Sequence, residues 1–74
     1  MKTFTAYVEQ DPETHIYAGI VPGIPGAHSQ GLTLEELQVN LKEVLELCLE
    51  ERDEERFWEP IVVHLEQVAT AVFN

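Results

Sequence analysis

The chain has 74 residues, and this length predicts a single domain spanning residues 1–74. Fourteen Asp and Glu residues against four Lys and Arg residues give a formal net charge of −10, so the basic footprint that nucleic-acid binding requires is absent. The sequence shows no apolar run that could span a membrane, no signal peptide and a single cysteine, and we therefore expect a cytoplasmic protein.

The first elements expected are two antiparallel strands joined by a turn. Apolar and polar residues alternate over residues 3–9, which predicts a half-buried strand. An Asp-Pro pair begins a turn over residues 10–14, and a second strand follows over residues 15–21. By alternation, Tyr7 and Tyr17 are expected on the outward face, either as cross-strand partners or as interface anchors.

A loop rich in proline and glycine follows the second strand. The doublets Pro22-Gly23 and Pro25-Gly26 lie three residues apart. Proline lacks a backbone N–H and ends a strand, while glycine can take the positive φ that a tight turn after proline requires. We therefore expect an ordered loop, with a short third strand over residues 27–30. The loop has no phosphate-binding motif.

The clearest helix begins after Thr33. Thr33 as N-cap and Glu36 three residues later form a capping box, and Leu32 with Leu37 fits a hydrophobic staple. Apolar residues at spacings of three and four predict one buried helix face. They are Leu34, Leu37, Leu41, Val44, Leu45 and Cys48.

The helix is expected to end between residues 52 and 56, because Pro60 cannot continue it. A last strand begins near Ile61, and the apolar residues 68–73 either extend it or add another strand. The order β-β-(β)-α-β predicts an α+β domain: a small antiparallel sheet with one helix packed on one face.

No residue set predicts catalysis, a metal site or a cofactor, and we expect no enzyme activity. The histidines His15, His28 and His64 share no metal-ligand spacing, and alternation places His64 on the exposed face of its strand. His28 beside Ser29 lacks the third, orienting group of a nucleophile–base pair. Cys48 falls on the apolar helix face, where a buried, inert thiol is expected.

Two features point to protein partners. Acidic residues gather at the expected helix end, either as tolerated surface or as a docking patch for a basic protein. The patch consists of Glu50, Glu51, Glu54 and Glu55. A domain this small buries only about 60% of its unfolded surface, and a β-branched last strand leaves an unpaired edge. We therefore expect a homodimer formed through the last strand.

The segment from the second strand into the helix resembles the HicB-like antitoxin family. The matching residues are Tyr17, Val21, Pro22, Pro25, Gly26, Ser29, Gln30, Gly31, Thr33, Glu35 and Glu36. Gly23 stands where the family usually has Asp, which leaves the loop uncharged. The resemblance implies a partial ribonuclease H-type fold, in a short stand-alone member without the C-terminal DNA-binding domain of longer ones.

The resemblance also implies a function. HicB-like proteins are antitoxins that bind a small basic, HicA-like ribonuclease toxin and cover its active site. We expect a binding module that neutralises such a toxin; the alternative is an orphan regulatory or scaffolding dimer with no toxin partner. The expected partner-binding residues are Pro22, Pro25, Gly26, His28, Gln30, Glu50, Glu51, Glu54 and Glu55.

Overall fold

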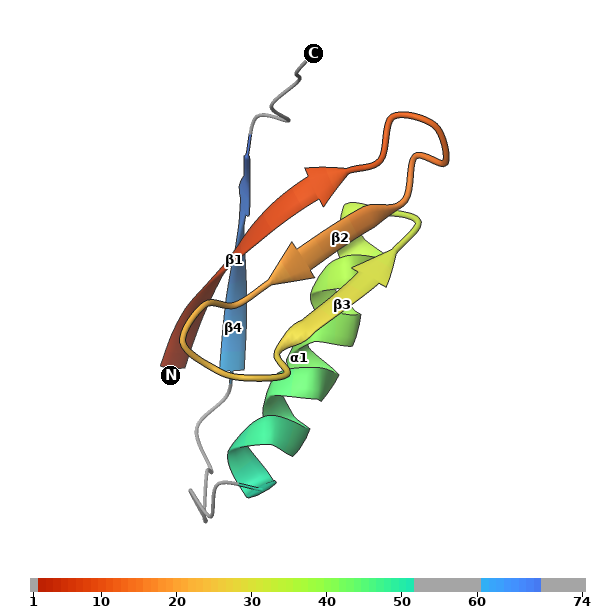
Figure 1. The fold of residues 1–74 in the computed structure, drawn as a ribbon. Helices are drawn as coiled ribbons and strands as arrows, with labels where there is room; N and C mark the ends of the chain where they lie inside the picture. Colours follow the sequence, from red (N-terminus) through yellow and green to blue (C-terminus); the bar gives the residue numbers. More distant parts are fainter. Residues whose placement is uncertain (1, 52–60, 69–74) are drawn as a thin grey trace.

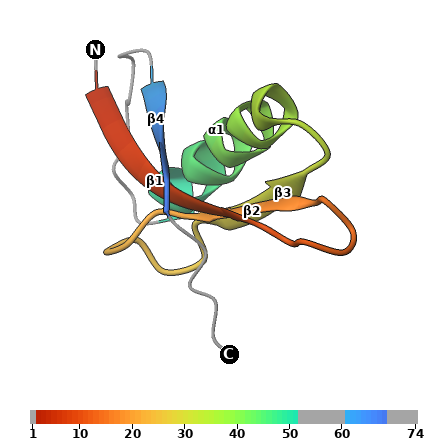
Figure 2. The same cartoon turned by 90° about the horizontal axis from the view of Figure 1, so that it is seen from above.

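The computed structural model describes residues 2–51 and 61–68, which form one sheet covered by one helix (Figure 1). The elements in chain order are β1 (Lys2–Gln10), β2 (Tyr17–Ile20), β3 (His28–Gly31), α1 (Leu34–Glu51) and β4 (Ile61–Gln67). The α+β class and the order of elements are confirmed. Seen from above in Figure 2, α1 lies on one side of the sheet, and no described helix or strand lies on the other.

The sheet is mixed, with the strand order β3-β2-β1-β4. β1 pairs with β2, and β2 with β3, in antiparallel fashion as expected. β4 instead runs parallel to β1, from Lys2↔Ile61 to Val8↔Gln67, so the expectation of a purely antiparallel sheet was wrong for this pair. The reason is the helix: α1 returns the chain across the sheet after β3, and such a crossover connects parallel strands.

β4 is an edge strand, as expected, but its free edge is partly covered. Val68 N–H donates to the Val8 carbonyl at 2.9 Å. The backbone groups of successive strand residues point to opposite sides, so every second residue counted back from Val68 bonds to β1 and the residues between them face the free edge. The Val63 carbonyl therefore points to the free edge, where Gln38 Nε2 donates to it at 2.6 Å. Residues 69–73, which could extend this strand, lie outside the described part of the chain.

The core lies between the inner face of the sheet and one stripe of α1. The fully or almost fully buried helix residues are Leu37, Leu41, Leu45 and Leu49, and the strands supply Ala6, Val8, Ile61 and Val63. The predicted helix face is confirmed for Leu34, Leu37, Leu41, Leu45 and Cys48, whereas Val44 does not pack against the core and the pattern missed Leu49. Gly19 of β2 allows the close approach, because a Cβ there would lie 3.0 Å from Leu41 Cδ1.

The helix begins as predicted, with a rearranged capping box. Thr33 Oγ1 accepts a bond from Glu36 N–H at 3.0 Å, which confirms Thr33 as the N-cap. Glu36 Oε1 accepts from Leu32 N–H at 2.6 Å, one residue before the cap. The predicted hydrophobic staple is wrong: Leu32 is 68% exposed, whereas Leu37 is fully buried and directed into the core beside Gly19.

The turn between β1 and β2 is longer than predicted. Asp11 Oδ1 accepts bonds from the N–H groups of Glu13 at 2.7 Å and Thr14 at 3.2 Å. His15 has a φ of 67°, a left-handed conformation that a strand cannot contain. β2 therefore begins at Tyr17 and not at His15.

The outward placement of Tyr17 was also wrong. Tyr17 is half-buried and packs against the core, on the same side of β2 as the buried Gly19. Tyr7 does face outward, with 44% of its surface exposed. The predicted helix end over residues 52–56 lies outside the described residues. Among those described, no helix has the length and apolarity needed to cross a membrane.

Candidate protein-binding surface

The loop between β2 and β3 is ordered, as the Pro-Gly doublets predict. Two consecutive turns close through Ile24 N–H to the Val21 carbonyl at 3.5 Å and Ala27 N–H to the Ile24 carbonyl at 3.0 Å. In each turn proline is followed by a glycine of positive φ, 90° at Gly23 and 85° at Gly26, the arrangement of a type II turn. A bond of 2.8 Å from Val21 N–H to the Ala27 carbonyl closes the base of the loop.

The loop is fixed against the later turns of α1. Cys48 Sγ lies 3.7 Å from the Pro25 carbonyl, to which it donates a weak hydrogen bond. A Cβ on Gly26 would meet the same sulfur at 3.6 Å. Cys48 packs against the core from the predicted apolar helix face, but it is half-buried rather than buried, because its sulfur lies against the loop.

The loop and the later turns of α1, which carry part of the predicted partner-binding set, lie at the same end of the molecule (Figure 1). Pro22, Pro25 and Gly26 are exposed and line a shallow hollow of about 300 Å³. Glu50 is exposed on α1, two residues beyond the cysteine that contacts the loop. The side chain of Glu51, together with Glu54 and Glu55, lies outside the described part of the chain.

His28 and Gln30 belong to a different surface, the side of the sheet that α1 does not cover. The register pairs Ile20 with His28 and Ala18 with Gln30, and all four are exposed. We call this surface the open face. Its central residues are Tyr7, Glu9, Ala18, Ile20, His28, Gln30, Glu66 and Val68. The predicted residues therefore divide between the loop end and the open face.

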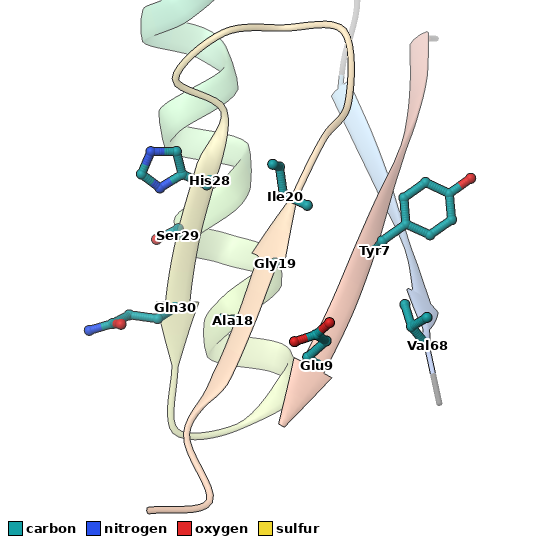
Figure 3. A pocket seen from close by; sticks show the side chains of 9 residues that line it. All are labelled: Tyr7, Glu9, Ala18, Gly19, Ile20, His28, Ser29, Gln30 and Val68. Carbon is teal, nitrogen blue, oxygen red and sulfur yellow. The ribbon is translucent and has the colours of Figure 1, made fainter. Parts of the chain in front are cut away.

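A row of side chains crosses all four strands on the open face. The register places Glu66 beside Tyr7, Tyr7 beside Ile20 and Ile20 beside His28. Figure 3 shows Ile20 between His28 and Tyr7, in a shallow hollow of about 560 Å³ that Val68 also lines. Sequence reasoning missed Ile20, because the expected outward placement of Tyr17 put Ile20 on the inward side of its strand.

The open face carries acidic side chains without basic ones among the described residues. Glu9 and Glu66 are both exposed there. Among residues 2–51 and 61–68, no Lys or Arg occupies this face, because Lys2 alternates to the helix side of β1 and Lys42 lies on α1. His64 Nε2 lies 3.3 Å from Glu66 Oε1, but side chains that are 58% and 56% exposed interact weakly in water.

The polar and titratable side chains of the described residues are spread over several elements. Within this part of the chain, no three His, Cys, Asp or Glu residues gather closely enough to hold a metal ion, and no polar side chain is buried. The histidines occupy separate elements: His15 a turn, His28 β3 and His64 β4. The N–H groups of Glu13 and, second, Thr14 lower the pKa of Asp11, whose carboxylate shapes its turn.

Comparison with known proteins relates the chain to the UPF0150 proteins. It is 57% identical to a UPF0150 protein of Thermotoga maritima over 54 residues, which cover 73% of this chain and 72% of the relative. Identity to an Archaeoglobus fulgidus UPF0150 protein is 36% over 67 residues, or 90% of this chain and 96% of the relative. A UPF0150 protein of Synechocystis is 50% identical over 48 residues. No family model and no solved structure matches the chain.

Proposed function

The chain belongs to the UPF0150 family, and we propose that it is a HicB-like binding module that neutralises a small basic ribonuclease toxin by protein–protein contact. The observation that carries the proposal is the combination of a net charge of −10 with a preorganised exposed loop and an exposed open face. Such a charge raises the encounter rate with a basic protein and disfavours nucleic acid. The proposed module is cytoplasmic and has no catalytic activity of its own.

Preorganisation of the loop supports this proposal. Two prolines, two glycines at positive φ and the contact from Cys48 fix the path of the loop before any partner arrives. A surface that is already ordered loses less conformational entropy on binding, and more of the contact energy then appears as affinity. The resemblance of residues 17–50 to HicB-like antitoxins lies largely in this loop and in the helix after it.

We also propose that the module is a homodimer paired through β4. Gln38 covers the Val63 carbonyl, so pairing would use the free groups of Leu65 and Gln67. A second copy that added β4 in antiparallel fashion would satisfy these groups and would keep both helices on the same side of the combined sheet.

The dimer can be tested at Gln67, whose N–H points to the free edge and whose side chain is exposed. Light scattering at micromolar concentration should give twice the chain mass of 8.4 kDa. Gln67→Pro removes the outward N–H and should give a monomer, while Gln67→Ala retains the N–H and should stay dimeric. A wild-type monomer would contradict the proposal, and so would a dimer that Gln67→Pro leaves intact.

Neutralisation can be tested with the product of the neighbouring reading frame. A short basic frame should arrest growth when expressed alone, and co-expression of this chain should restore growth and co-purify with it. An unrelated acidic protein of similar size and charge serves as the control, since bulk electrostatic attraction would make both proteins rescue. If no short basic frame lies nearby, or if rescue fails, the alternative of an orphan regulatory or scaffolding dimer is favoured.

A further inference from the structure

The open face presents apolar surface where a solvated sheet normally presents polar side chains. An antiparallel sheet with one face in water alternates polar residues outward. Here Tyr7 and Ile20 are 44% and 52% exposed on neighbouring strands, at directly paired positions, with Val68 beside them. These residues line one hollow together, so they form a contiguous patch and not scattered exposed residues.

Charge decides what can cover this patch. Glu9 and Glu66 flank the apolar residues, and among the described residues no Lys or Arg shares the face. A second copy of the chain packed face to face would add the same carboxylates and, from its described residues, no Lys or Arg, and this accumulation of like charge disfavours association. A partner segment with apolar side chains flanked by Lys or Arg would match both the patch and its charge.

The described part of the acidic helix end contributes exposed charge. Glu50 lies on exposed helix surface, and Leu47, three residues before it, is 62% exposed. Exposed charge mainly sets association rate, whereas the residues that dominate affinity are large side chains that become fully desolvated in a pocket. On the described surface, Tyr7 and Ile20 in their hollow fit that description.

We propose that the open face, and not the acidic helix end, is the docking surface for a basic, amphipathic segment of the partner protein. This inference rests on the proposed function, and it adds the surface and the chemistry of the segment that covers it. Apolar side chains of the partner would enter the hollow between Tyr7 and Ile20, and its cations would lie over Glu9 and Glu66.

A pair of matched variants tests the surface. Ile20→Asn and Val39→Asn each replace an exposed β-branched side chain with Asn. Ile20 is 52% exposed on the open face, and Val39 is 57% exposed on the outer surface of α1. Neither changes the net charge, so long-range attraction is the same in both. Burial of an Ile side chain predicts that Ile20→Asn weakens binding of the neighbouring basic chain about tenfold or more. Val39→Asn should have little effect.

Two further measurements keep the outcome decisive. Ile20→Thr retains the β-branched shape that strands favour, so it tests the face even if Ile20→Asn folds poorly. The ¹⁵N-labelled full chain is also titrated with a synthetic amphipathic helix of Leu and Lys, and with the same peptide carrying Glu in place of Lys. The Lys peptide should shift amide signals of β1, β2 and β3 around the hollow, and the Glu peptide should not.

The possible results separate this inference from the proposed function. If the neighbouring basic chain binds but Ile20 and Val39 variants behave alike, the docking surface is wrong and the function stands. If that chain does not bind the wild type, while the Lys peptide shifts the open-face signals and loses affinity with Ile20→Asn, the surface stands and the toxin partner is wrong. Peptide shifts centred on α1, or equal shifts with both peptides, overturn the surface.

Discussion

Replacing Gly31 with alanine should strongly destabilise the fold, because the backbone of β3 passes against the start of α1. A Cβ at position 31 would lie 2.7 Å from Leu37 N and 3.1 Å from both Glu36 C and Leu37 Cα. These neighbours are backbone atoms, so no side-chain rotation can relieve the contact. Ordinary contact begins at 3.4 Å, so the helix start and β3 must separate by about 0.7 Å.

The magnitude follows from what that separation disturbs. Overpacking in a well-packed region costs about 1–3 kcal/mol. The shift also strains the cap bonds from Glu36 N–H to Thr33 Oγ1 at 3.0 Å and from Leu32 N–H to Glu36 Oε1 at 2.6 Å. Loss of one cap costs about 1 kcal/mol. We therefore expect Gly31→Ala to lower the free energy of unfolding by about 2–4 kcal/mol, a large part of the stability of a small domain.

The assay is thermal and urea unfolding followed by circular dichroism, with Gly23→Ala as the control. Each 1 kcal/mol shifts the midpoint of a domain this size by about 4–8 °C, so Gly31→Ala should lower Tm by at least about 8 °C. At Gly23 a Cβ would meet nothing within 4 Å, and only the φ of 90° is unfavourable, which costs about 1–2 kcal/mol. The reasoning is refuted if Gly31→Ala is as stable as the wild type or more stable than Gly23→Ala.

Four further predictions concern the core, the cap, acid stability and charge. Leu41→Ala leaves a cavity at a fully buried site and should lower the free energy of unfolding, measured by urea titration, by about 2–5 kcal/mol. A smaller loss of unfolding free energy than a typical surface substitution causes would contradict the described core. Thr33→Ala removes the N-cap oxygen and should cost about 1 kcal/mol, whereas Thr33→Ser, which keeps that oxygen, should cost much less. The pKa of Asp11 in the folded protein lies below its usual 3.8, so the stability that its carboxylate contributes is present above the unfolded-state pKa and is lost as pH falls through the folded-state pKa. Asp11→Asn should therefore reduce the fall of Tm at acid pH. An unchanged fall of Tm at acid pH would argue against the turn bonds. Glu50→Lys should slow association with the basic chain and weaken the salt dependence of that rate, while leaving Tm nearly unchanged. If stopped-flow association rates change with neither salt nor the substitution, the acidic helix end has only a solubilising role.

The local elements of this protein were determined by its sequence at short range. Alternation along β1 and β4, the Thr33 cap and the apolar period of α1 each depend on neighbours a few residues away, and the structure has each of them. The Pro-Gly doublets likewise predict their own turns, because proline restricts φ and glycine permits the positive φ that follows.

Only the tertiary structure decided how these elements meet. The parallel pairing of β4 with β1 depends on the direction in which α1 crosses the sheet, which alternation within a strand cannot reveal. The inward side of Tyr17 and the exposure of Leu32 both depend on where α1 approaches β2 and β3, at Gly19 and Gly31. In both cases the prediction from the local pattern was wrong, because the packing of α1 against the sheet decides which side chains are buried.

The candidate surface shows the same division. The sequence identified the ordered loop and the acidic residues of the helix, because turn chemistry and charge are visible one residue at a time. The open face joins Tyr7, Ile20 and His28 from three strands with Glu66 and Val68 from the chain beyond α1. Strand order and register bring these residues together, and both are set by the packing of the whole sheet against one helix.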